Sequence, residues 1–405
     1  MNVTIYPSTP AGTVAAPPSK SMAQRLLICA GLTIGKTTVC GVARSEDVLA
    51  TVDCLRALHV DCAYRDGDVV VTGYTPHCGG EGAVLDCRES AGTLRFLLPL
   101  CLTGQPITFT GSERLLARPL GVYEDVCREQ GIAFEREASS LRVQGKLSPG
   151  EFRLPGDVSS QFVSGLLFAL PTLPGDSVIR LRPPVESRSY IDMTMDALCT
   201  FGVETRWTDR ETIAVPGRQY YKWQSDVTVE GDWSNAAPFL ALGVPVTGLD
   251  PDSLQGDRAC AEYFDALRCG PATLDLADCP DLGPLLFAFA AAHAGGVFTG
   301  TRRLRWKESD RSWAMYEELA KFGVAMRIGE NTVTVGHGLH APSERLNSHG
   351  DHRIVMALAV LCMITGGTIA GAEAVNKSFP DFFERLAALG VGIERQGENR
   401  YEHGL

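Results

Sequence analysis

The chain has 405 residues, of which 45% are hydrophobic and 21% charged, and its formal net charge is -11. This length allows two or three domains, and the composition is that of an ordinary folded protein and excludes a disordered one. The acidic balance argues against nucleic acid or an anionic membrane as partner, because both would be repelled unless a local basic patch outweighed the overall charge.

Cysteine and histidine patterns give no sign of a disulfide framework or a metal site. The thirteen cysteines are odd in number and contain no CxxC pair, so we expect reduced, mostly buried thiols. Eight scattered histidines without HxxxH or HExxH predict no metal. The start of the chain lacks a signal peptide, and no stretch offers 18 uncharged apolar residues, so we expect a cytoplasmic protein without a membrane partner.

One local pattern recurs six times along the chain: an amphipathic helical end, a small or turn residue, and a short β-type run. Gly after the last apolar residue is typical of a helix end, and the following Val or Ile run is typical of a strand. Such junctions are common in α/β proteins, but six copies spaced by roughly 55 to 72 residues favour real repeats grouped into globular lobes. The copies are residues 54–60, 126–132, 198–203, 264–270, 319–324 and 386–391.

Two points in the sequence are the best candidates for hinges between lobes. They are Pro17-Pro18, which stiffens the chain before a helix, and the stretch from 219 to 232, which ends in Glu230-Gly231-Asp232. We therefore predict one domain over residues 19-230 and a discontinuous second domain over 1-18 plus 231-405.

Several predicted helices begin next to cations or hydroxyls. Lys20 and Arg25 flank a helix that Ser21 can cap, and free backbone N–H groups, the helix dipole and two cations together make an anion site. Any one such segment is more often an ordinary helix cap, so this alternative stays open. Similar starts occur at Ser90 to Arg95, Ser159-Ser160-Gln161, Lys307 to Arg311, Asp351-His352-Arg353 and Lys377-Ser378.

Two further residues indicate the kind of chemistry. Arg114 lies in the loop 111–119, where it can bind a carboxylate or phosphate or form a surface ion pair. Asp281 precedes the very apolar helix 285–292, so we expect its carboxylate in a crevice where a shifted pKa would serve proton transfer. No Walker A or GxGxxG element is present. The pattern favours two small, multiply anionic substrates joined or exchanged by acid–base chemistry in a cleft between two lobes.

Taken together, these segments resemble the 5-enolpyruvylshikimate-3-phosphate synthase family, whose motifs they follow in order across nearly the whole chain. The resemblance implies a two-domain inside-out α/β barrel, with three βαβαββ repeats in each domain and the active site between them. We also expect a monomer. The motifs are Ser19-Lys20-Ser21 with Arg25, Ser90 to Arg95, Arg114 with Arg118-Pro119, Ser159 to Phe162, Ser187 with Tyr190 to Asp192, Glu230 to Asp232, Pro280-Asp281, Lys307 to Arg311, Asp351 to Arg353 and Lys377 to Pro380.

The resemblance implies transfer of the enolpyruvyl group of phosphoenolpyruvate to the 5-hydroxyl of shikimate 3-phosphate, with release of phosphate and without a metal or organic cofactor. It makes Asp281 the acceptor of the hydroxyl proton and Glu308 the donor to the methylene carbon, with Lys20 and Lys377 near the leaving phosphate. The implied shikimate 3-phosphate ligands are Lys20, Ser21, Arg25, Ser159, Ser160, Gln161, Ser187, Tyr190, Asp281 and Lys307. The implied phosphoenolpyruvate ligands are Lys20, Ala91, Gly92, Arg114, Gln161, Arg311, Arg353 and Lys377.

The sequence departs from the family pattern in three ways. Counting back from Arg95, Ala91 stands where the family commonly has Gly, so its methyl would project into the phosphoenolpyruvate pocket and weaken binding of bulkier analogues such as glyphosate. Arg303 stands where many members carry Asn near the substrate phosphate. The chain is also somewhat short, which we expect to remove loops and to leave the motifs intact.

Two other functions compete with this interpretation. UDP-N-acetylglucosamine enolpyruvyl transferases have the same fold and donor, but they typically carry a loop Cys that the segment 112–116 lacks. A noncatalytic anion-binding descendant would have no need to retain all of Lys20, Asp281, Glu308 and Lys377.

Overall fold

The computed structural model describes residues 1–73 and 82–396, and the chain divides into two compact units. Domain I comprises Met1–Pro17, Asp232–Pro251 and Asp257–Leu405, and domain II comprises Pro18–Gly231 with Asp252–Gly256. The chain passes between them at 17/18 and 231/232, one residue from each expected boundary, and again at 251/252 and 256/257, where we expected none. Each unit has its own cluster of buried apolar side chains, and helices alternate with mixed sheets, as predicted for the α/β class.

Domain II contains seven α-helices and twelve strands in its described residues. The helices are α1 (Lys20–Gly31), α2 (Glu46–Ala57), α3 (Ala91–Leu100), α4 (Glu113–Ala117), α5 (Gly121–Glu129), α6 (Ser160–Ala169) and α7 (Arg188–Thr200), with a 3-10 turn, η1 (Leu170–Thr172). The strands are β3 (Gly35–Cys40), β4 (Asp61–Arg65), β5 (Asp68–Gly73), β6 (Val84–Asp86), β7 (Ile107–Thr110), β8 (Ala133–Arg136), β9 (Ser140–Gln144), β10 (Glu151–Pro155), β11 (Ser177–Arg182), β12 (Arg206–Trp207), β13 (Thr212–Val215) and β14 (Asp226–Thr228).

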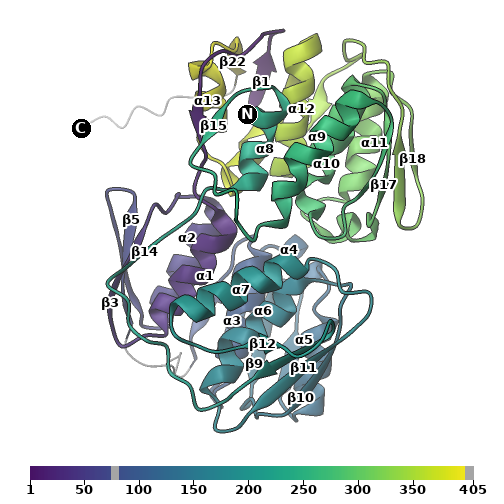
Figure 1. Ribbon diagram of the computed structural model, residues 1–405. Coiled ribbons are helices and arrows are strands. Elements are labelled where there is room, and N and C mark those ends of the chain that lie inside the picture. The colour runs from purple at the N-terminus through teal and green to yellow at the C-terminus, as the bar shows by residue number, and fades with distance from the viewer. Residues whose placement is uncertain (74–81, 397–405) are drawn as a thin grey trace. The chain divides into compact units, whose positions relative to one another are not determined.

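The strands of domain II form three four-stranded sheets with one pattern. The orders are β14-β3-β5-β4, β6-β7-β9-β8 and β10-β11-β13-β12, and in each the first pair is parallel and the other two are antiparallel. In the last two sheets a helix, α3 or α6, makes the crossover that a parallel pair requires. Both helices are apolar on nearly every side, so they pack together in the domain interior (Figure 1).

Domain I contains six α-helices and ten strands in its described residues. The helices are α8 (Trp233–Ala241), α9 (Cys260–Cys269), α10 (Gly283–Ala292), α11 (Arg311–Lys321), α12 (His352–Thr365) and α13 (Phe382–Ala388). The 3-10 turns are η2 (Gly256–Ala259), which begins on the last residue of domain II, η3 (Pro280–Leu282), η4 (Arg302–Trp306) and η5 (Ala372–Lys377). The strands are β1 (Asn2–Ile5), β2 (Val14–Ala15), β15 (Val246–Thr247), β16 (Ala272–Asp275), β17 (Gly296–Thr299), β18 (Met326–Ile328), β19 (Thr332–Val335), β20 (Leu346–Asn347), β21 (Gly367–Ala370) and β22 (Ile393–Gln396).

One unit of domain I is shorter than the others. Two sheets, β16-β17-β19-β18 and β20-β21-β1-β22, repeat the four-stranded pattern, but the third is only the parallel pair β15-β2. Helix α9 ends at Cys269 and β16 begins at Ala272, so this fully described stretch leaves no room for a strand pair between them. We expected the short chain to lack loops only; the structure instead lacks the last two strands of one unit.

The six predicted helix ends share one backbone feature: each turn residue has a positive φ angle. The values run from +66° at His59 to +153° at Gly270. Only glycine adopts this region without a steric penalty, which explains why five of the six copies carry Gly. His59 takes the same conformation in the first copy, where its backbone N–H donates to the Arg56 carbonyl at 2.9 Å.

All twelve described cysteines are free, and all but Cys40, Cys199 and Cys269 are buried, which confirms the prediction for this part of the chain; Cys78 lies outside the described residues. Among residues 1–73 and 82–396, no helix is long and apolar enough to cross a membrane. The same residues contain no group of three or more His, Cys, Asp or Glu side chains suited to a metal ion.

Candidate active site

The predicted anion-binding start of α1 differs from expectation in its cap. Ser19, and not Ser21, is the N-cap, since its hydroxyl accepts a hydrogen bond from the Met22 N–H at 3.3 Å. The Ser19 N–H donates to the Glu230 carbonyl at 2.8 Å, which helps hold Ser19 in the extended conformation that a cap needs. Ser21 therefore lies inside the first helical turn.

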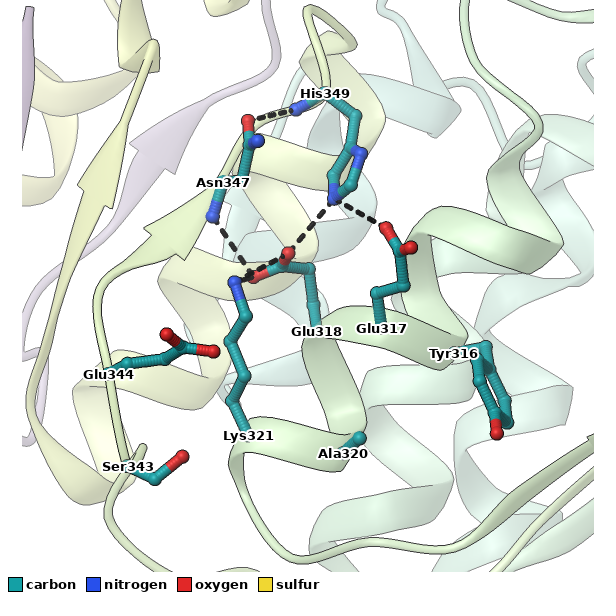
Figure 2. Close-up of a pocket in the computed structure, with 9 residues that line it drawn as sticks. All are labelled: Tyr316, Glu317, Glu318, Ala320, Lys321, Ser343, Glu344, Asn347 and His349. Atoms are coloured by element: carbon teal, nitrogen blue, oxygen red, sulfur yellow. Dashed lines mark hydrogen bonds and ion pairs between the residues drawn. The ribbon is translucent and has the colours of Figure 1, made fainter.

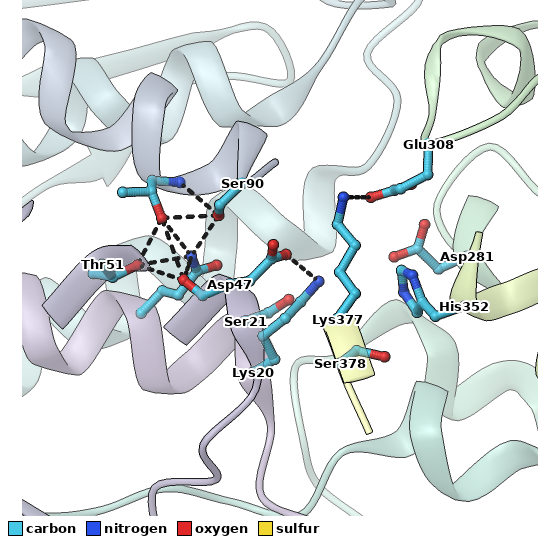
Figure 3. Close-up of polar contacts among 12 residues, drawn as sticks. Lys20, Ser21, Asp47, Thr51, Ser90, Asp281, Glu308, His352, Lys377 and Ser378 are labelled. Carbon is cyan, nitrogen blue, oxygen red and sulfur yellow. Dashed lines mark hydrogen bonds and ion pairs between the residues drawn. The ribbon is translucent and has the colours of Figure 1, made fainter. Parts of the chain in front are cut away.

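Lys20, the first residue of α1, is paired with a carboxylate that we did not predict. Its Nζ lies 2.9 Å from Oδ2 of Asp47, near the start of α2, and both side chains are largely buried (Figure 3). An acidic residue in the first turn of α2 was visible in the sequence, but only the fold shows that this turn lies beside Lys20.

Arg25 is 2% exposed and links α1 to α7. Its Nε donates to Thr194 Oγ1 at 2.8 Å, Nη1 to the Ser21 carbonyl at 2.7 Å and Nη2 to the Tyr190 carbonyl at 2.9 Å. Burial lowers the pKa of Arg25 to about 10, so the guanidinium remains charged at neutral pH. The structure thus brings Ser21, Arg25 and Tyr190 together, as their implied shared role requires.

Gln24, which the sequence reasoning missed, explains the glycine at the start of α3. Its Nε2 donates to Thr51 Oγ1 at 2.9 Å and to Thr93 Oγ1 at 3.2 Å. A methyl group at Gly92 would lie only 2.9 Å from Gln24 Oε1, so any side chain there would disturb this buried amide. Ala91, the first residue of α3, is itself 6% exposed.

Helix α6 begins with three of the predicted residues. Ser159 is its N-cap, accepting from the Gln161 N–H at 3.3 Å, and Ser160 is its first, buried residue. Gln161 Oε1 accepts a hydrogen bond from Arg95 Nη1 at 2.8 Å, and Arg95 stacks on the Phe162 ring. This arginine fixes the rotamer of Gln161.

The remaining two predicted residues of domain II differ in setting. Ser187 precedes α7, is buried, and has a left-handed φ of +53°, a conformation that is uncommon outside glycine. Arg114 lies on the short helix α4 with an exposed side chain.

In domain I the structure gathers Asp281 with three of the predicted cations. Asp281 Oδ1 lies 3.0 Å from Lys307 Nζ and 2.7 Å from Arg311 Nη1, and its Oδ2 lies 3.9 Å from Arg353 Nη2. Burial raises the pKa of Asp281, but the three cations outweigh it and hold the pKa well below its usual value. Burial also lowers the pKa of Lys307, against the opposing effect of Asp281. Asp281 is therefore ionised at neutral pH, and the three cations make it a weak base in this arrangement.

Arg311 is the centre of this cluster and is 1% exposed. It binds Glu308 Oε2 at 2.9 Å and Asp351 Oδ2 at 2.9 Å, in addition to Asp281. Burial lowers the pKa of Arg311, but the three carboxylates raise it well above its usual value. Lys377 Nζ lies 3.5 Å from Glu308 Oε1 (Figure 3). Residues separated by almost one hundred positions thus converge on one group.

Two polar residues around Arg353 complete the cluster. Arg353 Nη1 donates to Asn235 Oδ1 at 3.0 Å, and Ser378 Oγ lies 3.3 Å from the same oxygen. Asn235 was missed because its only sequence signal is its place three residues after the α8 cap, Asp232. Arg303, the departure noted above, donates from Nη2 to the Ala277 carbonyl at 2.6 Å.

The domain I cluster therefore contains four cations, Lys307, Arg311, Arg353 and Lys377, and three carboxylates, Asp281, Glu308 and Asp351. The surplus cation suits an anionic ligand, while Asp281 and Glu308 lie close enough to the arginines to exchange protons with a molecule bound there.

Comparisons with known proteins agree with this chemistry. The family model for EPSP synthase (3-phosphoshikimate 1-carboxyvinyltransferase) matches residues 6–386. The chain belongs to the EPSP synthase family. It is 38% identical to the 3-phosphoshikimate 1-carboxyvinyltransferase of Clostridium kluyveri, over 97% of this chain and 98% of that protein, and 35% identical to that of Clostridium novyi over the same shares.

Its fold is also similar to solved structures of the EPSP synthase family. An EPSP synthase from Acinetobacter baumannii matches with a TM-score of 0.77 at 23% identity, covering 97% of this chain and 100% of the other. At that identity the likeness concerns the fold alone. The predicted family is confirmed, whereas the roles of individual residues stay predictions.

Proposed function

We propose that this protein transfers the enolpyruvyl group of phosphoenolpyruvate to the 5-hydroxyl of shikimate 3-phosphate and releases phosphate, a step of the shikimate pathway to aromatic amino acids. Family membership along nearly the whole chain supports this activity. The observation that carries it is the contact of one ionised carboxylate, Asp281, with both Lys307 and Arg311, because this joins a proton acceptor to anion-binding groups.

In this proposal shikimate 3-phosphate is held mainly by domain II. Hydroxyls and amides at the starts of α1, α6 and α7 bind its phosphate together with Lys307, and Arg25 binds its carboxylate. The ligands are Lys20, Ser21, Arg25, Ser159, Ser160, Gln161, Ser187, Tyr190, Asp281 and Lys307.

Phosphoenolpyruvate carries two anionic groups, which the proposal assigns to different cations. Arg311 and Arg353 bind its carboxylate. Lys20, Arg114, Gln161 and Lys377 bind its phosphate, next to Ala91 and Gly92. Because arginine presents two parallel N–H groups, it suits a carboxylate better than lysine does.

The proposed chemistry is addition followed by elimination. Asp281 accepts the proton of the 5-hydroxyl as that oxygen attacks C2 of phosphoenolpyruvate, while Glu308 delivers a proton to the methylene carbon, which becomes a methyl. The tetrahedral adduct then expels phosphate as Glu308 takes a proton back from this methyl, which restores the double bond, and the proton on Asp281 passes to the departing phosphate. Lys20 and Lys377 stabilise the departing phosphate.

The proposed ligands come from both domains, so we infer that both must act on one substrate pair. We propose that each domain is part of an inside-out α/β barrel. We also propose that the protein acts as a cytoplasmic monomer, and sedimentation tests the oligomeric state.

The decisive experiment measures phosphate release from phosphoenolpyruvate with shikimate 3-phosphate, with UDP-N-acetylglucosamine and without an acceptor. The proposal expects release only with shikimate 3-phosphate and its collapse in Asp281→Ala and Glu308→Ala. Phosphate release that requires UDP-N-acetylglucosamine would instead indicate a UDP-N-acetylglucosamine enolpyruvyl transferase. Folded protein that binds shikimate 3-phosphate but releases nothing would indicate a noncatalytic descendant.

A further inference from the structure

Helix α11 carries a buried acidic residue, Glu318, that has no part in the proposed reaction. Glu318 lies seven residues after Arg311, and its side chain is 1% exposed. A pocket of about 540 Å³ opens beside it, lined also by Lys321, Asn347 and His349 (Figure 2). A charged carboxylate is stable at such a position only when its oxygens are well paired.

The partners of Glu318 come from its own helix and from residues 347–349, which begin at the last residue of β20. Lys321 Nζ lies 2.9 and 3.0 Å from the two carboxylate oxygens, the Asn347 N–H donates at 3.0 Å, and His349 Nε2 lies at 2.9 Å (Figure 2). Burial raises the pKa of Glu318, but these hydrogen bonds outweigh it and keep the pKa below its ordinary value. Two of the three partners therefore belong to one short segment, residues 347–349.

This segment leads directly into the candidate active site. The Asp351 N–H donates to the Ser348 carbonyl at 2.9 Å, and Asp351 caps α12 by accepting from the Arg353 N–H at 2.9 Å. Within the segment, His349 has a left-handed φ of +50°, which is unfavourable for a residue with a side chain and persists only where contacts enforce it. The bond to Glu318 is one such contact.

Helix α11 thus holds residues 347–351 at two points. Arg311 binds Asp351 at the start of the helix, and Glu318 binds Asn347 and His349 about 10 Å further along it, given the rise per residue of an α-helix. We propose that Glu318 is a positioning residue that fixes residues 347–351, so that Asp351 keeps its place as the cap of α12 and Arg353 keeps its orientation toward the carboxylate of phosphoenolpyruvate. This inference rests on the proposed function.

The position of Glu318 makes the expected effect selective between the two substrates. None of the proposed shikimate 3-phosphate ligands lies in residues 347–353, whereas Arg353 is a proposed phosphoenolpyruvate ligand. Loss of the Glu318 charge should therefore weaken phosphoenolpyruvate binding and leave shikimate 3-phosphate binding unchanged.

The first test compares Glu318→Gln with Glu317→Gln. Gln keeps the volume of Glu and removes its charge. Glu317 lines the same pocket but is 45% exposed, and its 3.8 Å separation from His349 Nε2 is too long for a hydrogen bond. We expect KM for phosphoenolpyruvate to rise about tenfold in Glu318→Gln and less than twofold in Glu317→Gln, since hydrogen bonds to a buried charge are worth that much. The dissociation constant of shikimate 3-phosphate alone should not change.

A second pair of variants keeps the test decisive should Glu318→Gln fail to fold. The side-chain amide of Gln can donate from near the position of the histidine Nε2, so His349→Gln should keep the wild-type KM for phosphoenolpyruvate, whereas His349→Ala should raise it. Equal KM values in an active wild type and Glu318→Gln would overturn the inference, as would equal behaviour of the two His349 variants. A wild type that releases no phosphate would overturn the proposed function, and this inference with it.

Discussion

Replacement of Asp281 by Asn removes the proposed proton acceptor with almost no change in volume. The side chain is 20% exposed and is bound by Lys307 and Arg311. Arg311 also contacts Glu308 and Asp351, so we expect it to keep its position in the variant and to bind the phosphoenolpyruvate carboxylate as before. The variant therefore separates the loss of proton transfer from the loss of phosphoenolpyruvate binding.

The expected magnitude follows from the role of a general base. Such a group contributes about 10²- to 10⁴-fold to a rate, and an amide cannot accept the proton, so we expect kcat to fall about 10³-fold, or about 4 kcal/mol. KM for phosphoenolpyruvate should change little. Asp281 raises the pKa of Lys307 against the effect of burial. Without it Lys307 should lose its proton at lower pH, and binding of shikimate 3-phosphate should weaken at a less alkaline pH than in the wild type.

The assay is steady-state phosphate release across pH, with Asp278→Asn as the control. Asp278 is an exposed carboxylate three residues earlier in the chain, so its neutralisation should leave kcat nearly unchanged. A folded Asp281→Asn variant that keeps more than a tenth of the wild-type kcat would refute the reasoning, because another group would then accept the proton.

Three further predictions concern other parts of the chain. Ala91→Gly should bind glyphosate more tightly than the wild type, and equal inhibition of both would contradict a methyl in the phosphoenolpyruvate pocket. Among the described cysteines, the exposed Cys199 and Cys269 should react first with a thiol reagent, as mass spectrometry can measure. Burial raises the pKa of the Cys29 thiol, so equally fast modification of Cys29 would contradict the packing. Glu318 has a pKa below its ordinary 4.5 in the folded protein, so its charge stabilises the fold above about pH 4.5 and this contribution is lost as pH falls further. The difference in unfolding free energy between Glu318→Gln and the wild type, measured by denaturant titration at several pH values, should therefore become smaller as the pH falls below about 4.5. A difference that stays constant with pH would contradict a lowered pKa of Glu318.

Much of the fold could be predicted because its signals are local. The positive φ at the six repeated helix ends favours Gly, which five of them carry. A hydroxyl or carboxylate before a helix marks where its first turn begins. Even so, local rules were ambiguous at Ser19-Lys20-Ser21, where two serines can serve as caps and the bond from Ser19 N–H to Glu230 decides between them. The missing strand pair after α9 left no positive signal, because an absent hairpin shows only as a short interval between two units.

The candidate site was predictable where a residue carries a charge in a motif, and not where its role depends on a distant neighbour. The sequence motif identified Asp351 as a candidate residue. Its buried ion pair with Arg311 depends on the packing of α11 against α12, which the motif does not show. Gln24 and Asn235 are uncharged residues inside helices, and only the fold shows that they hold Thr93 and Arg353. These contacts between residues far apart in the sequence depend on the tertiary structure, which no local sequence pattern encodes.

The charges of the domain I cluster explain how the same residues can be stable without substrate and reactive with it. Buried cations must be paired, and Asp281, Glu308 and Asp351 provide the negative charge around Arg311. An incoming carboxylate on Arg311 would supply negative charge of its own, so the cation would hold Asp281 less strongly in its ionised form. The pKa of Asp281 would then rise, which makes Asp281 a stronger base. Binding of the anionic substrate would in this way prepare the proton transfer to Asp281, because it offsets the cations that hold the pKa of this carboxylate well below its usual value.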